Sequence, residues 1–269
     1  MQLVYPAYVP GASRLAEALP ALAAQGVQFV EWLLGNGEYF DAADPVQVRE
    51  VQDLLRQTGV RVSSLHSEFG AQADLSSLDP GVRAATLETH RAGLALAGEL
   101  GARFFVVHPG HGPCGDRQEE RLAHTLESLR VLEPVARAAG VVLALENLPP
   151  AYPGSRPEEL LQIIDAVASP YLGICFDTGH AHLSGEGARL ARALLPRAVT
   201  MHLHDNDGSG DQHRFPGTGT LDWAEFGRIY RAVGCTAPGM LECAPPEGWS
   251  WDRCGAAVRA LTAGADQAG

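Results

Sequence analysis

The sequence contains no lysine, and this absence limits what the protein can bind. All 20 basic residues are therefore arginines, against 32 Asp and Glu, and the formal net charge is −12. Proteins that grip a long polyanion normally present a basic stripe that neutralises its phosphates. The arginines form no cluster along this chain, so we do not expect a nucleic-acid partner. One or two arginines would still suffice to hold a small phosphorylated molecule.

Cysteines are few, and long apolar runs are missing. The five cysteines are odd in number and include no C-x-x-C pair, which argues against a disulfide framework or a zinc–thiolate site and favours reduced thiols. No apolar run approaches the length of a membrane span. The first residues, MQLVYPAY, lack the basic segment, apolar stretch and cleavage site of a secretory signal. We therefore expect a cytoplasmic protein with no membrane partner.

Short β-like segments alternate with longer helix-like segments along the 269 residues. Strands are expected at residues 2–5, 27–33, 60–66, 103–108, 141–146, 172–177, 198–204 and 239–243. Helices are expected at residues 12–24, 44–57, 79–100, 118–139, 157–167, 187–195, 222–232 and 251–261. Eight such cycles without a linker predict an α/β fold, a closed (β/α)8 TIM barrel, as a single domain over residues 1–269. A doubly wound open sheet is the alternative, but no G-x-G-x-x-G follows the first strand.

Seven of the eight expected strands end in an acid or an imidazole. They are Glu31, His66, His108, Glu146, Asp177, His202 and Glu242. Residues two apart on a strand share a face, so these side chains point into the barrel if the larger apolar residues pack on the helices. Barrel enzymes hold their active sites at this end of the strands. Converging carboxylates repel one another unless cations or protons intervene, so we predict a metal site. A purely polar sugar-binding mouth is the competing interpretation.

Further candidates lie in the loops. His180 follows Asp177 by three residues in D-T-G-H, and Asp211 and His213 belong to the segment VTMHLHDNDGSGDQH at residues 199–213. Imidazoles and carboxylates together suit a divalent ion such as zinc or manganese. We expect these three residues to join the pocket. His204 is interpreted as facing the substrate or supporting the ligands.

Four residues beside the site receive other interpretations. Asp205 and Asp207 are expected to form turns. Trp32 follows Glu31 and is a candidate apolar wall of the pocket, although strand alternation turns it toward a helix. Arg214 is the arginine nearest the ligand loop; it is interpreted as a solvated surface residue, with a substrate phosphate as the alternative partner.

The motifs in this order resemble the xylose isomerase-like TIM barrels, which include sugar-phosphate isomerases and epimerases and endonuclease IV. The resemblance covers nearly the whole chain. It rests on LH at 65–66, VVHPG at 106–110, LEN at 145–147, DTGH at 177–180, HLHD at 202–205, DQH at 211–213 and LE at 241–242. Each motif is weak alone, but their order and spacing together are specific.

The resemblance implies two different ligand sets. In the isomerases and epimerases, one divalent metal is held at the positions of Glu146, Asp177, His202 and Glu242; the two glutamates move protons, and the position of His180 contacts substrate. In the endonuclease branch, three zinc ions also use the positions of His66, His108, His180, Asp211 and His213. This chain retains all nine residues, so one to three Zn²⁺ or Mn²⁺ ions are expected.

The leading hypothesis is a divalent-metal-dependent isomerase or epimerase of a small sugar or sugar phosphate, with Glu146, Glu242 and His180 as catalytic residues. The alternative is a multinuclear zinc or manganese metallohydrolase of the endonuclease IV type, acting on a phosphodiester or small ester. A third hypothesis is a metal-dependent sugar-binding protein. The acidic, small loop after His66 and the net charge count against DNA as the substrate.

Overall fold

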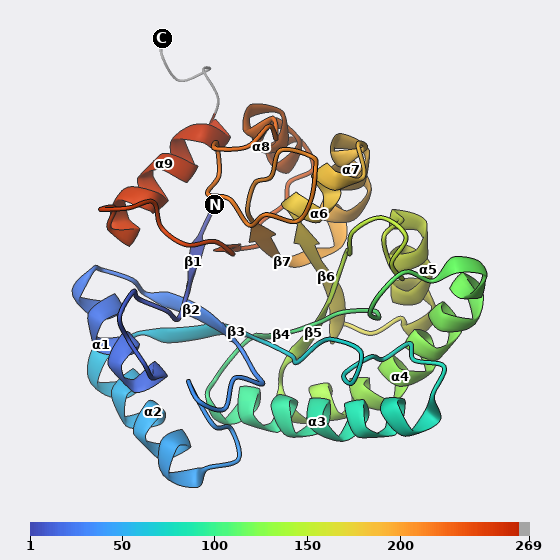
Figure 1. Ribbon diagram of the computed structural model, residues 1–269, viewed down its shortest axis with the longest axis horizontal. Coiled ribbons are helices and arrows are strands. Elements are labelled where there is room, and N and C mark those ends of the chain that lie inside the picture. Colours follow the sequence, from blue (N-terminus) through green and yellow to red (C-terminus); the bar gives the residue numbers. More distant parts are fainter. Residues whose placement is uncertain (264–269) are drawn as a thin grey trace.

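Eight parallel strands close into a barrel in the computed structural model, which describes residues 1–263 (Figure 1). Each strand pairs with its neighbours in chain order, and β8 returns to pair with β1. The strands are β1 (Leu3–Pro6), β2 (Phe29–Leu33), β3 (Arg61–His66), β4 (Phe104–Val107), β5 (Val142–Glu146), β6 (Leu172–Asp177), β7 (Ala198–Leu203) and β8 (Gly239–Leu241). The predicted barrel is confirmed and the open sheet is excluded. Residues 264–269, the end of the predicted domain, lie outside the described residues.

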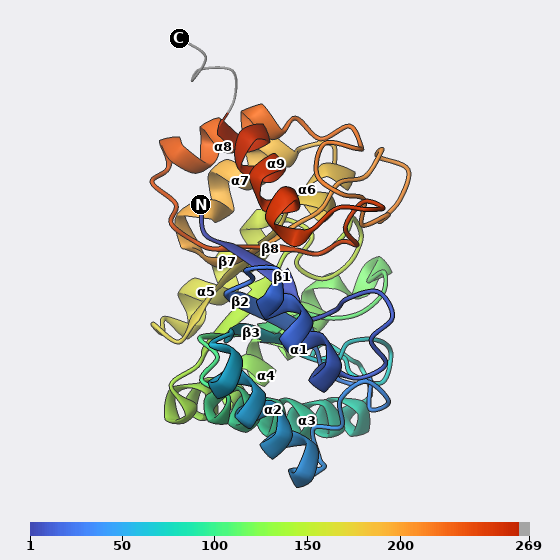
Figure 2. The same ribbon diagram turned by 90° about the vertical axis from the view of Figure 1, so that its left-hand side faces the viewer.

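Helices surround the barrel, and the loops that follow the strands gather on one side of it (Figure 2). The α-helices are α1 (Leu15–Ala24), α2 (Pro45–Thr58), α3 (Pro80–Glu99), α4 (Gln118–Ala139), α5 (Pro157–Val167), α6 (Thr178–Leu183), α7 (Gly187–Leu194), α8 (Trp223–Ala232) and α9 (Trp251–Ala263). Short 3-10 turns precede α4 and β7, at Gly115–Arg117 and Leu195–Arg197. The sequence did not predict α6, because its six residues are too short to show a helical period.

Local signals account for where several helices begin and end. Asp44 accepts a hydrogen bond from the backbone N–H of Val46, and the proline that follows it starts α2. Asp79 caps α3 in the same way. Such a cap contributes about 1 kcal/mol. Gly59 ends α2 in the left-handed region, at φ 72°, which glycine adopts without steric cost.

Two apolar layers lie on either side of the strands. The outer layer packs on the helices and includes Phe105, Leu143 and Phe176. The inner cluster fills the barrel and consists of Phe104, Val106, Ala144 and Cys175, with Val142 and Val199 packed against it. The predicted alternation of inward-facing and outward-facing side chains is therefore confirmed on β4, β5 and β6. Because the inner cluster occupies the lower barrel, the next inward positions lie at the mouth.

Three strands end one residue or more earlier than predicted. β4 ends at Val107, β7 at Leu203 and β8 at Leu241, so His108, His204 and Glu242 follow directly after the ladder. Their backbones are then no longer held by two neighbouring strands. The side chains lie at the junction between the rigid barrel and its loops, where functional residues commonly lie.

A buried ion pair holds two of these loops together. Arg121 of α4 lies 3.0 Å from Asp74, which belongs to the segment after β3. The same guanidinium donates to the carbonyl oxygens of His111 and Gly112, in the segment after β4. Both groups are largely buried. This pair fixes the loops that follow His66 and His108 relative to one another.

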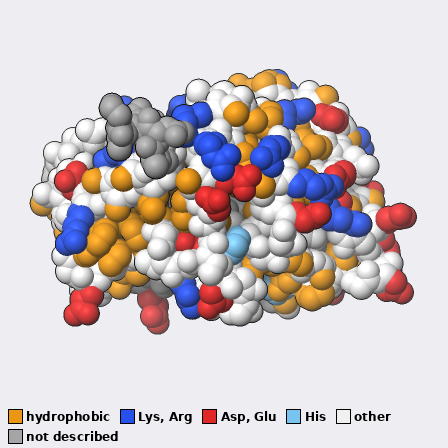
Figure 3. Space-filling model, turned by 90° about the horizontal axis from the view of Figure 1, so that it is seen from above, with side chains coloured by type: hydrophobic (Ala, Val, Ile, Leu, Met, Phe, Trp, Pro, Cys, Tyr) orange, Lys and Arg blue, Asp and Glu red, His pale blue; other side chains and the backbone are white. Residues whose placement is uncertain are grey.

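The face over α8 and α9 carries several basic side chains with acidic side chains beside them (Figure 3). Arg192 of α7 pairs with Glu225 of α8 at 3.2 Å, and Arg189 pairs with Glu186 at 2.8 Å. Exposed pairs of this kind contribute little to stability.

Among residues 1–263, no helix is both long and apolar enough to cross a membrane.

Candidate metal centre

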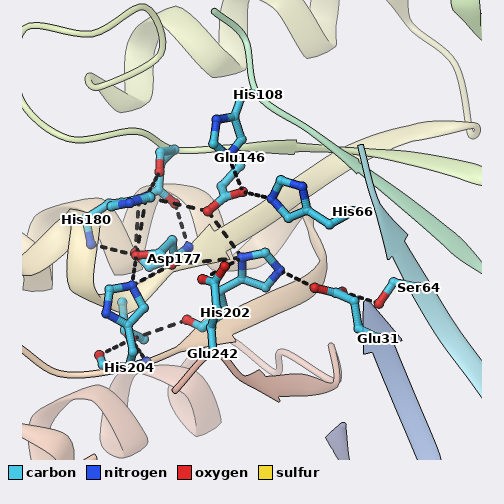
Figure 4. Close-up of polar contacts among 12 residues, drawn as sticks. Glu31, Ser64, His66, His108, Glu146, Asp177, His180, His202, His204 and Glu242 are labelled. Carbon is cyan, nitrogen blue, oxygen red and sulfur yellow. Dashed lines mark hydrogen bonds and ion pairs between the residues drawn. The ribbon is translucent and has the colours of Figure 1, made fainter. Parts of the chain in front are cut away.

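The nine predicted ligand residues form one connected group at the mouth of the barrel, and Figure 4 shows the members that come from the strand ends and from α6. Every member has a side-chain nitrogen or oxygen within 3.5 Å of another member. They come from the ends of strands, from α6 and from the loop after β7. The predicted convergence of these residues is therefore observed.

Glu146 lies at the centre of the group and is almost fully buried. Its Oε2 atom lies 3.3 Å from Nε2 of His66 and 3.3 Å from Nε2 of His108. Its Oε1 atom lies 3.2 Å from Nδ1 of His202. Although two imidazole nitrogens approach it, Oε2 makes no hydrogen bond of acceptable geometry. A buried anionic oxygen without a partner is costly, and a cation would satisfy it.

Asp177, His202 and Glu242 surround Glu146 on one side. Nδ1 of His202 lies 3.1 Å from Oε2 of Glu242 and 4.0 Å from Oδ2 of Asp177. Oε2 of Glu242 is a second buried oxygen without a hydrogen bond. One ligand atom from each of these three residues and from Glu146 lies within 4.8 Å of the others. Three carboxylates and one imidazole suit a divalent ion of the zinc or manganese kind.

His180, Asp211 and His213 form the more open part of the group. Oδ2 of Asp211 lies 3.3 Å from Nε2 of His180 and 3.2 Å from Nε2 of His213, so it bridges the two imidazoles. The loop returns to the barrel because Asp205 and Arg214 exchange two backbone hydrogen bonds of 2.8 Å. His213 has a φ of 46°, a left-handed conformation that costs a non-glycine residue about 1 kcal/mol or more.

Three of the imidazoles are held by backbone carbonyl oxygens. Nδ1 of His66 lies 2.8 Å from the carbonyl of Ser67, and Nδ1 of His180 lies 2.9 Å from that of Asn147. Nδ1 of His213 lies 2.9 Å from the carbonyl of Glu242. Each contact places a proton on Nδ1 and turns Nε2 toward the carboxylates. Metal-binding histidines typically have this arrangement, which fixes the ring and its tautomer.

His204 is a tenth candidate that sequence reasoning did not place among the ligands. It is fully buried, and its Nε2 lies 3.1 and 3.0 Å from the two carboxylate oxygens of Asp177. Its ring stacks on that of His213, with centroids 4.1 Å apart. It belongs to one potential ligand group with Asp177 and His180, and to another with His213 and Glu242. The sequence did contain a signal for His204: it lies two positions after His202, so its side chain is expected on the same, inward face of the strand.

Glycine at position 179 makes room for His204. A Cβ atom at Gly179 would lie 2.0 Å from Cε1 of the His204 ring. Because α6 and the segment after β7 press together here, any larger residue would displace the imidazole. The glycine of D-T-G-H is therefore required by the site itself.

Glu146 and Glu242 are held in their charged form. Burial raises the pKa of Glu146, but His202 and His108 outweigh it and hold that pKa well below its usual range. Burial also raises the pKa of Glu242, and His202 again lowers it below the usual range. In the absence of a metal, a positive charge on His202 therefore balances these acids.

The pKa values of the two imidazoles in the more open part of the group are raised instead of lowered. Burial lowers the pKa of His180, but Asp177 and Asp211 outweigh burial and raise it to about 10. Burial likewise lowers the pKa of His213, which Asp211 and Glu242 raise to about 9. These protons occupy positions that a divalent cation would take, so metal binding would release them.

Comparison with known proteins places the chain in a family. A family model described as xylose isomerase-like TIM barrel matches residues 19–255. The chain belongs to this family. A relative from Solibacter usitatus named Probable endonuclease 4 is 30% identical, over 69% of this chain and 70% of that protein. The resemblance inferred from the motifs is confirmed.

Solved structures agree with this xylose isomerase-like assignment. A D-tagatose 3-epimerase-like protein has a TM-score of 0.81 and 24% identity, covering 96% of this chain and 94% of that one. The TTHB071 protein of Thermus thermophilus, soaked with ZnCl2, has a TM-score of 0.72 and 30% identity, covering 97% and 96%. Epimerases and endonucleases both occur among the similar proteins, so the choice between them rests on the site.

In this xylose isomerase-like barrel, Asp205 and Asp207 shape the loop, as predicted. The Asp205 carboxylate accepts hydrogen bonds from the backbone N–H of Gly217 at 2.9 Å and from the indole of Trp223 at 2.8 Å. Asp207 lies 2.7 Å from Arg214 and holds its guanidinium. Arg214 is half-exposed and paired within the loop, which agrees with its interpretation as a surface residue.

Of two aromatic residues near the site, Trp32 does not line the pocket and Phe69 does contact a candidate ligand. Trp32 is buried and packs edge-on against Phe40, with centroids 5.9 Å apart, on the helix side of β2. The wall interpretation is therefore wrong, and strand alternation predicted its direction correctly. Phe69, which sequence reasoning passed over, is 48% exposed and stacks on His108 at 4.5 Å. An exposed aromatic ring against a candidate ligand marks the apolar part of the mouth.

Proposed function

We propose that this xylose isomerase-like barrel is a divalent-metal-dependent epimerase or isomerase of a small sugar. The observation that carries the proposal is the convergence of Glu146, Asp177, His202 and Glu242, whose ligand atoms lie within 4.8 Å of one another. Glu146 ends β5 and Glu242 follows β8, and each places a carboxylate oxygen near Nδ1 of His202, at 3.2 Å and 3.1 Å (Figure 4). Two carboxylates in one site would allow one to remove a proton from a bound sugar and the other to return one.

The residues present fit a divalent ion. Glu146, Asp177, His202 and Glu242 would hold it, and the two buried carboxylate oxygens without hydrogen bonds would then gain a partner. Zinc and manganese both accept this mixture of oxygen and nitrogen donors. A bound ion of this kind supplies Lewis-acid polarisation of a sugar carbonyl, which acidifies the neighbouring C–H.

Glu146 and Glu242 would carry out the proton transfers. One carboxylate would take the proton from the carbon beside the carbonyl. The other, after taking a proton from solvent, would return it to that carbon from the opposite face. Glu242 is a quarter exposed and is reached from the mouth, whereas Glu146 lies deeper. Nδ1 of His180 is held by the carbonyl oxygen of Asn147, and its Nε2 lies 3.3 Å from Asp211. His180 would therefore donate a hydrogen bond to a substrate oxygen through Nε2 when that oxygen replaces Asp211.

The surroundings favour a neutral sugar over a phosphorylated one. Arg214, the arginine nearest the ligand loop, is already bound to Asp207. Phe69 presents an exposed ring beside His108 and offers an apolar surface to the C–H face of a sugar. We therefore expect a small ketose or aldose without a phosphate to be the better substrate.

A multinuclear phosphodiester hydrolase is the second candidate, and two observations favour it. His66 and His108 both approach the same oxygen of Glu146, and Asp211 bridges His180 and His213. Two or three ions would use these contacts, generate hydroxide and stabilise an in-line displacement. The absence of lysine and the net charge of −12 oppose a long polyanionic substrate.

Solvent isotope exchange separates the candidates. The chelator-stripped protein, reloaded with Mn²⁺, Co²⁺ or Zn²⁺, is incubated in D₂O with a panel of ketoses and aldoses. We expect deuterium at the carbon beside the carbonyl, together with an epimeric or isomeric sugar, and one tightly bound ion per chain. No exchange with any sugar, together with two or three ions and cleavage of an aryl phosphodiester, would establish the hydrolase instead. Sugar binding without exchange would indicate a binding protein.

A further inference from the structure

Glu31 is a buried acid that the proposed reaction does not use. It lies on β2, is 1% exposed and sits below the mouth of the barrel (Figure 4). Its Oε1 atom lies 3.0 Å from Nε2 of His202, and its Oε2 atom accepts a hydrogen bond from the hydroxyl of Ser64. The strand register places Ser64 directly beside Glu31. Both oxygens of the carboxylate are therefore committed to specific partners.

Glu31 is not placed to bind the ion itself. Among residues 1–263, the groups whose ligand atoms converge within 4.8 Å include Glu146, Asp177, His202 and Glu242 but not Glu31. The His202 ring lies between them. Its Nε2 faces Glu31, while its Nδ1 lies 3.2 Å from Glu146 and 3.1 Å from Glu242.

His202 is thus supported differently from His66, His180 and His213. Those three rings donate from Nδ1 to a backbone carbonyl and turn Nε2 toward the carboxylates. In His202 the roles of the two nitrogens are exchanged, and a carboxylate replaces the carbonyl. A carboxylate is the stronger acceptor, and it makes the opposite nitrogen a better electron-pair donor.

We propose that Glu31 is a positioning residue that prepares His202 to bind the ion through Nδ1. Glu31 accepts a hydrogen bond from Nε2–H of His202, which fixes the tautomer with its lone pair on Nδ1 and holds the plane of the ring. Ser64 in turn holds the carboxylate of Glu31. The chain Ser64–Glu31–His202 spans β3, β2 and β7 and crosses the barrel beneath the ion site. The inference rests on the ion site of the proposed function, and not on the sugar reaction.

Ion affinity tests the proposal without turnover. Dissociation constants for Co²⁺ are measured by chelator competition, and the visible absorption of bound Co²⁺ reports the geometry of its ligands. Glu31→Leu keeps the approximate size of the side chain but removes the acceptor, and we expect affinity to fall about 10- to 100-fold with an altered spectrum. Glu31→Gln keeps a neutral acceptor for Nε2–H, so it should recover most of the affinity. Ser64→Ala should weaken binding less than Glu31→Leu does.

A matched control uses another buried glutamate. Glu159 contacts Arg156 and Gln118 and no residue of the ion site. Glu159→Leu should lower the thermal stability and leave the Co²⁺ affinity and spectrum unchanged. It therefore reports the cost of losing a buried carboxylate as such.

The outcomes distinguish the role of Glu31 from the existence of the ion site. Wild-type protein that binds no Co²⁺ overturns the ion site, whereas wild-type binding that Glu31→Leu leaves unchanged overturns only the role of Glu31. A variant that loses stability but keeps the wild-type affinity and spectrum shows a purely structural role and also overturns it. If Glu31→Leu does not fold, wild-type values in both Glu31→Gln and Ser64→Ala overturn the proposal, and weakened binding in Ser64→Ala supports it.

Discussion

His180 should make the stability of the metal-free protein depend on pH. Both of its ring nitrogens face acceptors: Nδ1 lies 2.9 Å from the carbonyl oxygen of Asn147, and Nε2 lies 3.3 Å from Asp211. Burial opposes the charged form, but Asp177 and Asp211 outweigh it and raise the pKa to about 10. The folded protein therefore keeps a proton on His180 that the unfolded chain loses near pH 6.5.

The sign and size of the effect follow from this difference. A folded pKa above the unfolded one gives stabilisation that is complete below pH 6.5 and is lost as the pH rises through about 10. The interval between 6.5 and about 10 corresponds to about 5 kcal/mol. Between about pH 7 and 9.5 the free energy of unfolding should fall by about 1.4 kcal/mol per pH unit through this residue.

Urea unfolding of the chelator-stripped protein at about pH 6, 8 and 9.5 measures the effect. His180→Gln removes the titrating group while keeping a polar side chain. His213, whose pKa is raised to about 9, contributes a slope of the same sign in both proteins, so the difference between them isolates His180. Equal slopes in the wild type and His180→Gln would refute the reasoning.

Ion binding at His180 itself, which the multinuclear candidate includes and the one-ion site does not, should reverse the trend. A divalent ion needs an unprotonated imidazole nitrogen, so its affinity rises with pH as the proton on Nε2 becomes easier to displace. With an ion at His180, saturating Mn²⁺ should abolish the loss of stability between about pH 6.5 and 8.5 in the wild type. If Mn²⁺ adds the same stability at both pH values, the ion does not replace this proton.

Three further predictions concern the glutamate pair, the crowded glycine and the loop anchor. Glu242→Gln should slow deuterium exchange about 10²- to 10⁴-fold, measured by mass spectrometry of the sugar; exchange at the wild-type rate would remove Glu242 from the proton-transfer pair. Gly179→Ala places a Cβ atom 2.0 Å from Cε1 of His204, so we expect a loss of about 1–3 kcal/mol of stability and weaker Co²⁺ binding; wild-type values for both would show that the ring is not crowded there. Arg121→Met leaves Asp74 buried without its cation and should cost about 3–5 kcal/mol in urea unfolding; a loss below about 1 kcal/mol would show that the pair does not anchor the loops.

The barrel and most of its rim could be predicted because the signals are local. Strand alternation depends only on residues two positions apart, and it correctly turned Trp32 toward the helices and Val106, Ala144 and Cys175 into the barrel. Parallel strands bring their carboxyl ends to one rim. Acids and imidazoles at the strand ends therefore had to converge, whichever helices surrounded them.

Other features depend on contacts between distant parts of the chain. Glu31 and His202 are separated by 171 positions, and no local pattern shows that they touch. The burial of His204 against Asp177 depends on how α6 packs beside the segment after β7. Phe69 lies in an irregular loop, whose path has no sequence period.

The sequence by itself therefore determined the fold, the residue types at the mouth and the classes of metal they suit, because these follow from alternation and side-chain chemistry. The tertiary structure decided which ring nitrogen of each imidazole faces the carboxylates, and which oxygens of Glu146 and Glu242 stay without a partner. Those details depend on the packing of separate strands to within fractions of an ångström, and they distinguish a ligand from the residue that positions it.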